Sequence, residues 1–322
     1  MKEVPFSTVL SALTSPDRAF PARYLPRFSD LEGADLAAFV RTWSGVSLEQ
    51  KRVFLRNLVD KFEEDTIVSY EAMAAKIIKD DDALVRVLAL KLLTETSDNR
   101  LIAPITHILN SDPDPEVRAQ AAIVLGGFVH LGELEELAEH KLKQVEDALL
   151  LAAHHENAYV GRAALEALGY SARPEVAQLI EDALNRHDPL WQASGLFAAG
   201  RSGHVRWQEY ILTGLLSEDD PVRLAAAQSV GLVDLKIARK PLIDMLEEEA
   251  DDDVFQAIIW SLSQIGGEDV RTYLEAILAE AEDDDQIEFL EEALANLSFT
   301  EDMEEFDMLA IDPDDLLDEE KD

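Results

Sequence analysis

Two histidines and a glutamate stand side by side in the stretch HHENAYVGRAALEALGY, residues 154–170. Imidazole nitrogens and carboxylate oxygens are ligands for transition metals such as iron and zinc. From residue 157 onward the apolar residues recur with the spacing of a helix, so His154, His155 and Glu156 stand at the start of that helix. The stretch is therefore either a metal site or a turn between helices that happens to contain histidine.

The helix that follows these residues is one copy of an internal repeat. In each copy Asp or Asn leads an apolar anchor, and most copies have a small residue about four positions on and an apolar residue about eight positions on. This spacing places the apolar side chains on one face of a helix. The clearest anchors are Val85, Val117, Val160, Val222 and Val254, in steps of 32, 43, 62 and 32 residues, with a variant copy at Trp191 inside the step of 62.

A second set of helices precedes these copies. The stretches 100–110, 175–185 and 238–249 all have helical apolar spacing. Each repeat is therefore a helix pair that can bury its apolar face only by stacking on its neighbours. We expect the leading Asp to cap the second helix of each pair, and Pro115, Pro189 and Pro221 to be first helical residues.

The pattern Asp-Pro-x-Val-Arg with Ala-rich spacing resembles the HEAT repeat, especially the short bacterial subclass called phycobilin-lyase-like HEAT repeats. The resemblance covers about residues 66–298 and implies an all-α fold: a right-handed α-solenoid of about seven HEAT-like helix pairs with an N-terminal cap. The whole chain also resembles a bacterial group of HEAT-repeat proteins with a leader like SDLEGADLAAFVRTW (29–43), which implies no particular activity.

The metal interpretation can be weighed against deoxyhypusine hydroxylase, a HEAT-repeat enzyme that holds two irons with several His-Glu pairs. Its motif resembles RAALEALG (162–169), but its His-Glu would fall here on Arg162 and Ala163, which cannot ligate iron. The pair His155-Glu156 stands seven residues too early, in the turn before Asn157. We therefore interpret these residues as turn residues and predict no metal site, no cofactor and no catalytic set.

The ends of the chain differ from the repeats. Residues 1–46 are predicted to be an N-terminal cap, partly irregular, and residues 47–300 the solenoid, beginning with a helix at 47–62. Residues 301–322 are an acidic segment with interspersed apolar residues, which is typical of disordered tails that either bind partners or solubilise a neighbouring repeat. The pairs Gly126-Gly127 and Gly266-Gly267 are expected at helix ends.

Charge narrows the class of partner. The net charge of -38 disfavours nucleic acid and membrane surfaces and favours a protein partner with a basic surface. No apolar stretch approaches the roughly 20 residues of a membrane helix, the N-terminus is not a convincing signal peptide, and cysteine is absent. The cytoplasm is the expected location.

We expect the second helix of each pair to line the concave face of the solenoid. Positions two, three, six and ten after the anchor then point outward, and the candidates are taken from positions six and ten, because aromatic residues and Arg there are typical of interface hot spots. The alternative is that these side chains fill gaps between repeats. The predicted partner-binding residues are Lys91, Ile123, Glu166, Tyr170, Phe197, Arg201, Gln228, Trp260 and Gln264.

Acidic runs precede several of the second helices and are expected to align along one edge. They either cap helices, where the macrodipole favours carboxylates, or dock a basic partner or weakly bound Ca²⁺. The acidic edge comprises Asp80, Asp81, Asp82, Asp219, Asp220, Asp251, Asp252, Asp253, Asp283, Asp284 and Asp285. By resemblance to HEAT-like folds, Arg86, Arg118 and Arg223 pair with turn Asp residues and form a ladder between repeats.

These observations predict a non-catalytic protein-binding scaffold or adaptor whose partner docks on the concave face. The alternative is a HEAT-like enzyme or enzyme subunit, which by resemblance would be phycobilin-lyase-like or hydroxylase-like. A chromophore transferase needs a binding cleft, and a hydroxylase needs the His-Glu pairs that this sequence lacks at the repeat positions.

Overall fold

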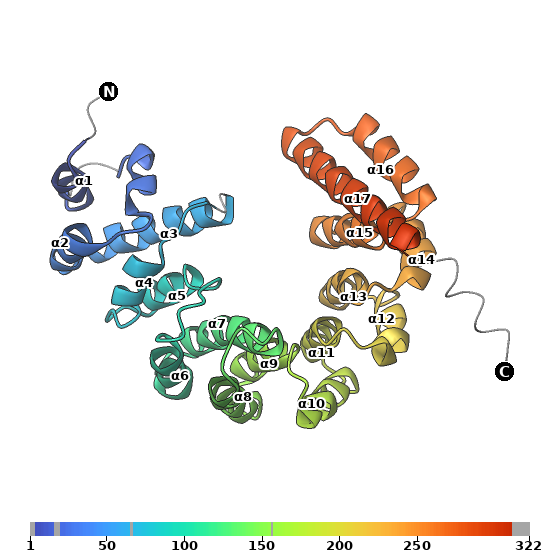
Figure 1. The fold of residues 1–322 in the computed structure, drawn as a ribbon, viewed down its shortest axis with the longest axis horizontal. Coiled ribbons are helices and arrows are strands. Elements are labelled where there is room, and N and C mark those ends of the chain that lie inside the picture. Colours follow the sequence, from blue (N-terminus) through green and yellow to red (C-terminus); the bar gives the residue numbers. More distant parts are fainter. Residues whose placement is uncertain (1–3, 16–19, 65–66, 156, 311–322) are drawn as a thin grey trace. The chain divides into compact units, whose positions relative to one another are not determined.

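The computed structural model describes residues 4–15, 20–64, 67–155 and 157–310. Within these residues every regular element is a helix, as the repeat pattern predicted (Figure 1). No helix among the described residues has the length and apolar character needed to cross a bilayer. The chain divides into two compact units, Met1–Ala172 and Arg173–Asp322, which are called unit 1 and unit 2.

Unit 1 contains two rows of helices. The first helices of the pairs are α4 (Glu71–Ile77), α6 (Ile102–Ser111) and α8 (Glu139–Ala153). The second helices are α5 (Ala83–Lys91), α7 (Pro115–Glu133) and α9 (Ala158–Leu168), and each packs on the next along its row, preceded by α3 (Leu48–Glu64). Helix α3 occupies the position of the helix predicted at 47–62.

Unit 2 repeats the same arrangement with four pairs. Its first helices are α10 (Pro174–Leu184), α12 (Gln208–Gly214), α14 (Arg239–Leu246) and α16 (Glu268–Glu280), and the 3₁₀ turns η2 (Val205–Trp207) and η3 (Lys236–Ala238) lead into α12 and α14. Its second helices are α11 (Pro189–Arg201), α13 (Asp220–Leu232), α15 (Asp252–Ile265) and α17 (Asp284–Ala310). Unit 1 thus has three helix pairs and unit 2 has four, and within each unit the pairs stack as expected for an α-solenoid.

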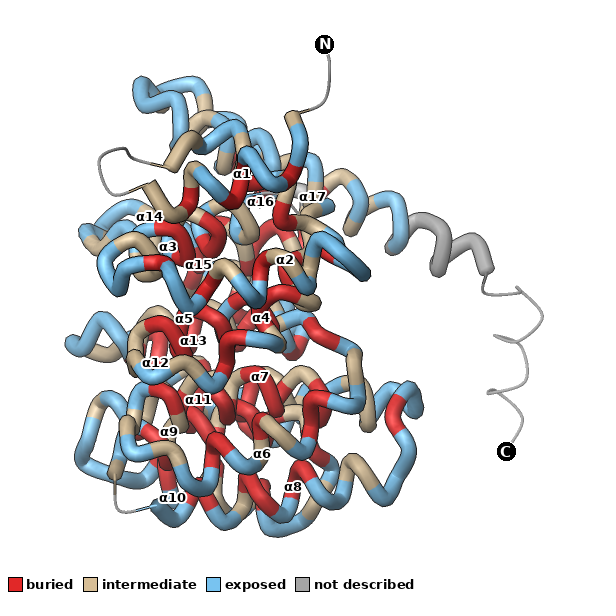
Figure 2. Tube along the Cα trace, turned by 90° about the vertical axis from the view of Figure 1, so that its left-hand side faces the viewer, coloured by how far each residue is buried: buried red, intermediate tan, exposed pale blue. Residues whose placement is uncertain are grey.

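Small residues let the second helices approach closely. A Cβ on Gly126 of α7 would lie 3.0 Å from the Cα of Ala167 in α9, and a Cβ on Gly200 of α11 would lie 2.9 Å from the Cα of Ser229 in α13. The Ser229 hydroxyl, fully buried, donates to the carbonyl of Leu196 one repeat earlier (2.9 Å). Figure 2 shows buried residues running through the packed helices of both units.

The placement of the glycine pairs differs in part from the prediction. Gly126 and Gly127 lie inside α7 and not at its end, because Gly126 serves helix packing rather than a left-handed turn. Gly266 and Gly267 do end α15, with φ of 62° and 123°, which side chains other than hydrogen rarely allow.

Helix caps follow the predicted pattern with one difference. Asp82, Asp114, Asn157, Asp188 and Asp251 each accept backbone N–H bonds at the start of a second helix. The exception is α13, which begins at Asp220, so that Pro221 is its second residue and not its first. The carboxylate of Asp220 instead accepts a bond from Arg223 (2.7 Å), which holds it on the helix surface.

The N-terminal region is built around aromatic residues. Helices α1 (Phe6–Leu13) and α2 (Gly33–Trp43) and the 3₁₀ segment η1 (Ala22–Phe28) enclose Phe28, whose ring meets those of Phe39 and Phe54 edge-on at 5.9 and 4.7 Å between centroids. Phe54 belongs to α3, so this region seals the first solenoid helix with an apolar cap.

The C-terminal helix extends beyond the expected boundary at residue 301. Helix α17 continues to Ala310, and Arg271 of α16 donates to Glu301 within it (2.5 Å). The remainder of the predicted acidic tail, residues 311–322, lies outside the described residues.

Candidate functional site

The side chains predicted to line the partner-binding face are all reachable by solvent. Lys91 is exposed, and the other eight are half-buried, so none is enclosed in the core. Four of the nine lie in unit 1: Lys91, Ile123, Glu166 and Tyr170. The other five, Phe197, Arg201, Gln228, Trp260 and Gln264, lie in unit 2.

Unit 2 carries a groove of about 440 Å³ across its second helices, here called the aromatic groove. It brings together four predicted residues, and the others in its lining come from the same row of helices. The lining residues are Phe197 of α11, Leu224, Gln228 and Leu232 of α13, Asp253, Gln256, Ala257, Trp260, Ser261 and Gln264 of α15, and Phe289 of α17. Lys91, Ile123, Glu166 and Tyr170 do not take part in it, and the Tyr170 ring instead packs against His130 at 4.4 Å.

Aromatic rings form the apolar part of this groove. The rings of Trp260 and Phe289 lie 6.5 Å apart between centroids, on neighbouring helices. The guanidinium of Arg201 lies 4.3 Å from the centre of the Phe197 ring, within cation–π distance. Arg201 is thus placed beside the groove and fixes the Phe197 ring from one side.

Three glutamine amides form the polar part of the groove. Among the described residues the side chains of Gln228, Gln256 and Gln264 have no hydrogen-bond partner; Gln256 is exposed, and Gln228 and Gln264 are half-buried. The Gln264 amide reaches across to α13, where its Oε1 lies 2.0 Å from the position that a Cβ on Gly231 would take. Gly231 therefore makes room for this amide.

Sequence reasoning missed part of this lining, although the signal was present. Leu224 and Gln256 stand two positions after the anchors Val222 and Val254, a spacing that also points outward on a second helix. Phe289 was missed because the copy in α17 has no clear anchor. Asp253 was predicted as part of the acidic edge and also lines the groove.

In unit 1 the acidic edge is part of the structure of the turn before α5. Burial raises the pKa of Asp80, but bonds from Lys51 (2.6 Å), the Asp82 amide and Trp43 (2.8 Å) outweigh it, so the pKa lies below its ordinary value. The Arg52 guanidinium binds both oxygens of Asp82 and lowers the pKa of that carboxyl. These two carboxylates are occupied, while Asp81 is exposed.

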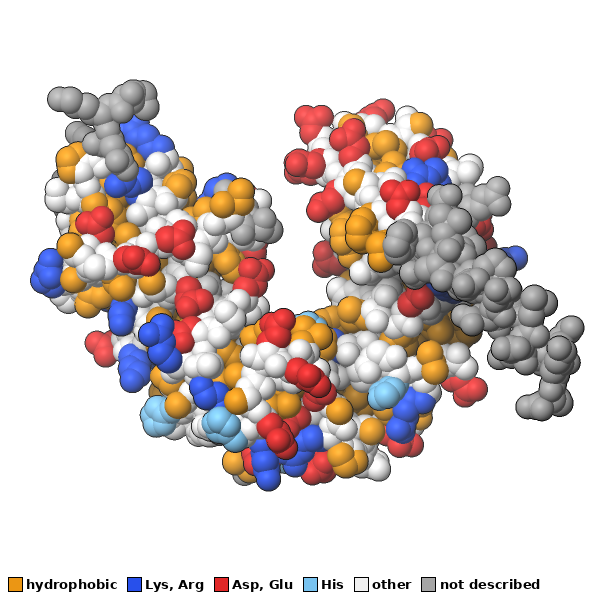
Figure 3. Space-filling view, in the orientation of Figure 1, with side chains coloured by type: hydrophobic (Ala, Val, Ile, Leu, Met, Phe, Trp, Pro, Cys, Tyr) orange, Lys and Arg blue, Asp and Glu red, His pale blue; other side chains and the backbone are white. Residues whose placement is uncertain are grey.

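In unit 2 most of the acidic edge faces solvent. Asp251 caps α15, and Asp283 accepts from the amides of Asp285 and Gln286 at the start of α17. The other carboxylates of this edge besides Asp220 have no hydrogen-bond or ion-pair partner among the described residues: Asp219, Asp252, Asp253, Asp284 and Asp285. Figure 3 shows acidic side chains gathered over the α15–α17 part of unit 2.

The predicted arginines pair with the turns between repeats. Arg86 donates to both oxygens of Asp112 (2.8 Å each), and Arg223 donates to both oxygens of Glu249 (2.8 and 2.9 Å). The Arg223 bonds lower the pKa of Glu249. Among the described residues Arg118 bonds only the backbone carbonyl of Asp112 (2.5 Å), so its predicted pairing with a turn carboxylate is wrong.

His155 has a structural role in the turn before α9. Its Nδ1 accepts from the backbone N–H of Asn157 (3.0 Å), two residues on. Asp80, Asp112 and Glu249 make the equivalent bond in other repeats, each to the N–H of a capping Asp. His155 therefore replaces a turn carboxylate, and among the described residues no three His, Asp or Glu side chains form a set that could hold a metal ion.

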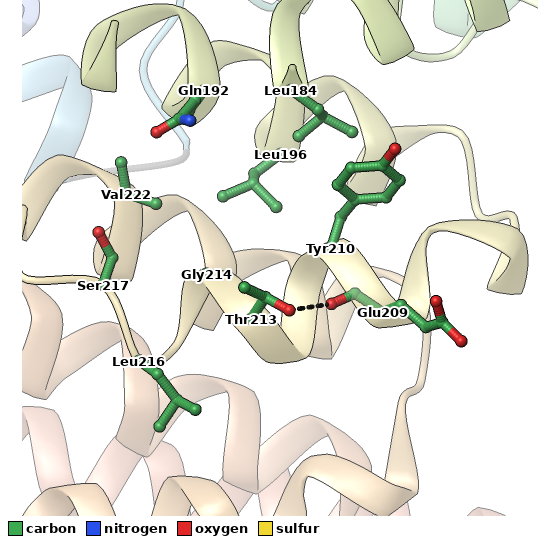
Figure 4. A pocket seen from close by; sticks show the side chains of 10 residues that line it. All are labelled: Leu184, Gln192, Leu196, Glu209, Tyr210, Thr213, Gly214, Leu216, Ser217 and Val222. Atoms are coloured by element: carbon green, nitrogen blue, oxygen red, sulfur yellow. Dashed lines mark hydrogen bonds between the residues drawn. The ribbon is translucent and has the colours of Figure 1, made fainter. Parts of the chain in front are cut away.

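A second groove of about 540 Å³ lies in unit 2 at the ends of the helices. Figure 4 shows side chains of α10, α11, α12 and α13 around it, including Leu184, Leu196 and Tyr210. Thr213 turns its hydroxyl away to donate to the carbonyl of Glu209 (2.7 Å). This groove has both apolar and polar lining residues. It was not predicted from the sequence, because most of its lining lies on first helices and the turns after them, and not at the outward positions of second helices.

Several solved structures are similar to the chain at low sequence identity. It is similar to YibA of Escherichia coli (15% identity, 92% of this chain and 98% of that chain, TM-score 0.41). It is also similar to the complex of CpcE and CpcF of phycocyanin lyase from Nostoc (16%, 70% and 94%, TM-score 0.47) and to human deoxyhypusine hydroxylase (16%, 91% and 96%, TM-score 0.37). No curated protein matches the sequence.

The family model for HEAT repeats matches residues 71–137 and 209–295, one stretch in each unit. These stretches include the pairs α4/α5, α6/α7 and α14/α15 and all but one residue of α12/α13, and with them Arg86, Arg223 and both of their carboxylate partners. With this match and the helix pairs of each unit, the chain contains HEAT repeats in both units.

Proposed function

We propose that this HEAT-repeat protein is a non-catalytic scaffold that binds a partner protein across the second helices of unit 2. The observation that carries the proposal is the aromatic groove, in which Phe197, Trp260 and Phe289 are half-buried rather than enclosed. Large aromatic side chains with one face open to solvent are typical anchors of protein interfaces.

Charge supports a partner with a basic surface. Residues 211–322 contain 6 Lys or Arg and 34 Asp or Glu, and no Lys or Arg is among the groove's lining residues. Exposed carboxylates at the starts of α15 and α17 add a negative field beside the apolar anchors. Such a field speeds encounter with cationic surfaces, and the aromatic anchors supply specificity.

The test is affinity capture from the native host's lysate at low and high salt. The wild type is compared with a Phe197→Ala/Trp260→Ala double variant and with a Val205→Ala/Ile237→Ala control, whose side chains are exposed in η2 and η3 away from the groove. We expect a discrete partner that survives high salt, is captured by wild type and control, and is lost from the double variant.

Two results would contradict the proposal. One is capture of only a salt-sensitive mixture of basic proteins, because this would reflect net charge and no specific surface. The other is equal capture by the double variant and the wild type. Either result would direct attention to the enzyme alternative and to small molecules.

A further inference from the structure

The aromatic groove has polar groups that a side-chain anchor alone would not use. Gln228, Gln256 and Gln264 each offer an amide N–H₂ and an amide oxygen without a partner among the described residues. They line the same groove as the rings of Phe197 and Trp260. A surface that combines free amides with apolar walls suits a ligand that presents backbone N–H and C=O groups together with apolar side chains.

Secondary structure distinguishes between possible peptide ligands. A helix satisfies its own backbone groups, so it would bury the three amides without giving them partners, which costs free energy. An extended strand has unpaired N–H and C=O groups on both edges and can pair with amides, as peptides do when they add to a sheet edge. The free amides therefore favour an extended ligand over a helical one.

The charge around the groove selects the side chains of that ligand. Asp253 is exposed, lines the groove and has no partner among the described residues. Two further exposed carboxylates lie near it: Asp252, its neighbour in α15, and Asp285 in α17, the next second helix. Lys and Arg carry long apolar stems that can lie along aromatic rings while the charged head reaches a carboxylate.

We propose that the aromatic groove binds an extended peptide segment in which apolar residues alternate with Lys or Arg. The backbone of the segment pairs with Gln228 and Gln264, its apolar side chains rest on Trp260 and Phe197, and a cationic side chain meets Asp253. This inference rests on the proposed function and names the class of partner segment. Second helices packed about 9 Å apart from α11 to α17 give room for about eight extended residues at roughly 3.3 Å each.

The probe is a fluorescein-labelled peptide of about eight residues that alternates leucine and lysine, measured by fluorescence anisotropy with the full-length protein. The matched variant pair is Gln228→Leu/Gln264→Leu, which keeps side-chain bulk and removes the amides, against Gln208→Leu, which changes an exposed glutamine on the first-helix row. Circular dichroism confirms that each variant is folded.

We expect the double variant to weaken binding about tenfold or more, and Gln208→Leu to leave it unchanged. A peptide N-methylated at alternate residues, which lacks half of the backbone donors, should bind the wild type with a similar loss. A leucine–glutamate peptide should not bind, and Asp253→Asn should weaken the leucine–lysine peptide several-fold at low salt.

The inference is overturned if a stapled amphipathic helix of the same composition binds more tightly than the extended probe, or if N-methylation has no effect. It is also overturned if the wild type binds neither leucine–lysine form. In these cases a partner captured through Phe197 and Trp260 would still support the proposed function, since that experiment does not depend on the shape of the bound segment.

Discussion

Arg86 holds both carboxylate oxygens of Asp112, a residue 26 positions later in the turn before the next second helix. In the other unit Arg223 holds Glu249, again 26 positions later. In each case a third nitrogen of the arginine also bonds a carbonyl six residues earlier, of Asp80 or Ser217. One side chain thus ties the turn of its own repeat to the turn of the next.

Replacing Arg86 with Ala should lower the free energy of unfolding by about 3 kcal/mol, because it leaves the Asp112 carboxylate buried without its partner. The side chains of this pair are only 11% and 8% exposed, which keeps solvent screening small. The measurement is thermal and urea unfolding followed by circular dichroism.

The matched control is Arg100→Ala. Arg100 pairs with Asp98 at 2.8 Å but is 86% exposed, so its loss should leave the unfolding midpoint nearly unchanged. The Arg86→Ala/Asp112→Ala double variant should recover part of the loss, because no unpaired charge remains. Equal effects of Arg86→Ala and Arg100→Ala would show that the ladder does not stabilise the fold.

Glu249 gives unit 2 a pH-dependent contribution. Arg223 lowers the pKa of Glu249 in the folded state, so the stabilisation is complete above the ordinary glutamate pKa of about 4.3. It is lost as pH falls from there through the lowered folded-state pKa, since protonation then favours the unfolded state. Wild type should exceed Glu249→Gln in stability at pH 7, and this difference should shrink below about pH 4.

Urea unfolding of both proteins between about pH 3 and pH 7 measures this difference directly. Comparing variant with wild type at each pH removes the effect of the other carboxylates, which also change self-repulsion as they titrate. A difference that stays constant across the range would contradict the assignment of the pair.

Gly200 marks where α11 and α13 are closest, and its replacement tests that packing. In Gly200→Ala the new Cβ would lie 2.9 Å from the Cα of Ser229, a backbone atom that cannot move without shifting α13. We expect a loss of about 1–2 kcal/mol, after allowance for alanine's better helix propensity. Gly45→Ala, whose Cβ would meet only the Thr42 carbonyl at 3.5 Å, should leave the unfolding midpoint nearly unchanged.

His155 can be tested as a turn residue rather than as a ligand. His155→Asp should keep the bond to the Asn157 N–H, as Asp112 does to the N–H of Asp114, and preserve stability. His155→Ala should lose about 0.5–1 kcal/mol, the usual net value of one hydrogen bond at a partly exposed site. Differential scanning calorimetry measures the unfolding midpoints of the two variants. Equal midpoints would contradict the proposal that the imidazole stabilises the turn through this hydrogen bond.

The fold could be predicted from the sequence because each repeat contains the local signals that specify its own helices. An anchor such as Val117, a capping Asp114 and Pro115 together specify where a helix begins and which face it buries. Seven repetitions of such local signals leave little freedom for another architecture.

The site was only partly predictable because it depends on neighbours distant in sequence. Asp80 and Asp253 were both predicted as members of one acidic edge that either caps helices or docks a partner. Asp80 is held by Trp43 and Lys51, 37 and 29 residues away, while Asp253 opens onto the aromatic groove. Charge patterns along the chain cannot separate these cases, since the difference is made by which side chains other helices bring within reach.

The Arg86 pairing also sets where the chain tolerates changes of length. One residue inserted between Asp112 and Asp114 would move the carboxylate that Arg86 holds relative to the cap of α7. At the opposite end of α7, Glu133 accepts a bond from the Ala172 N–H (3.0 Å), but among the described residues no arginine–carboxylate pair holds the loop at 134–138. The longer step from Val117 to Val160 is accommodated there by the long helices α7 and α8 and by this loop. A tag or a whole folded module could therefore be spliced into that loop, while the capped turns should be left untouched.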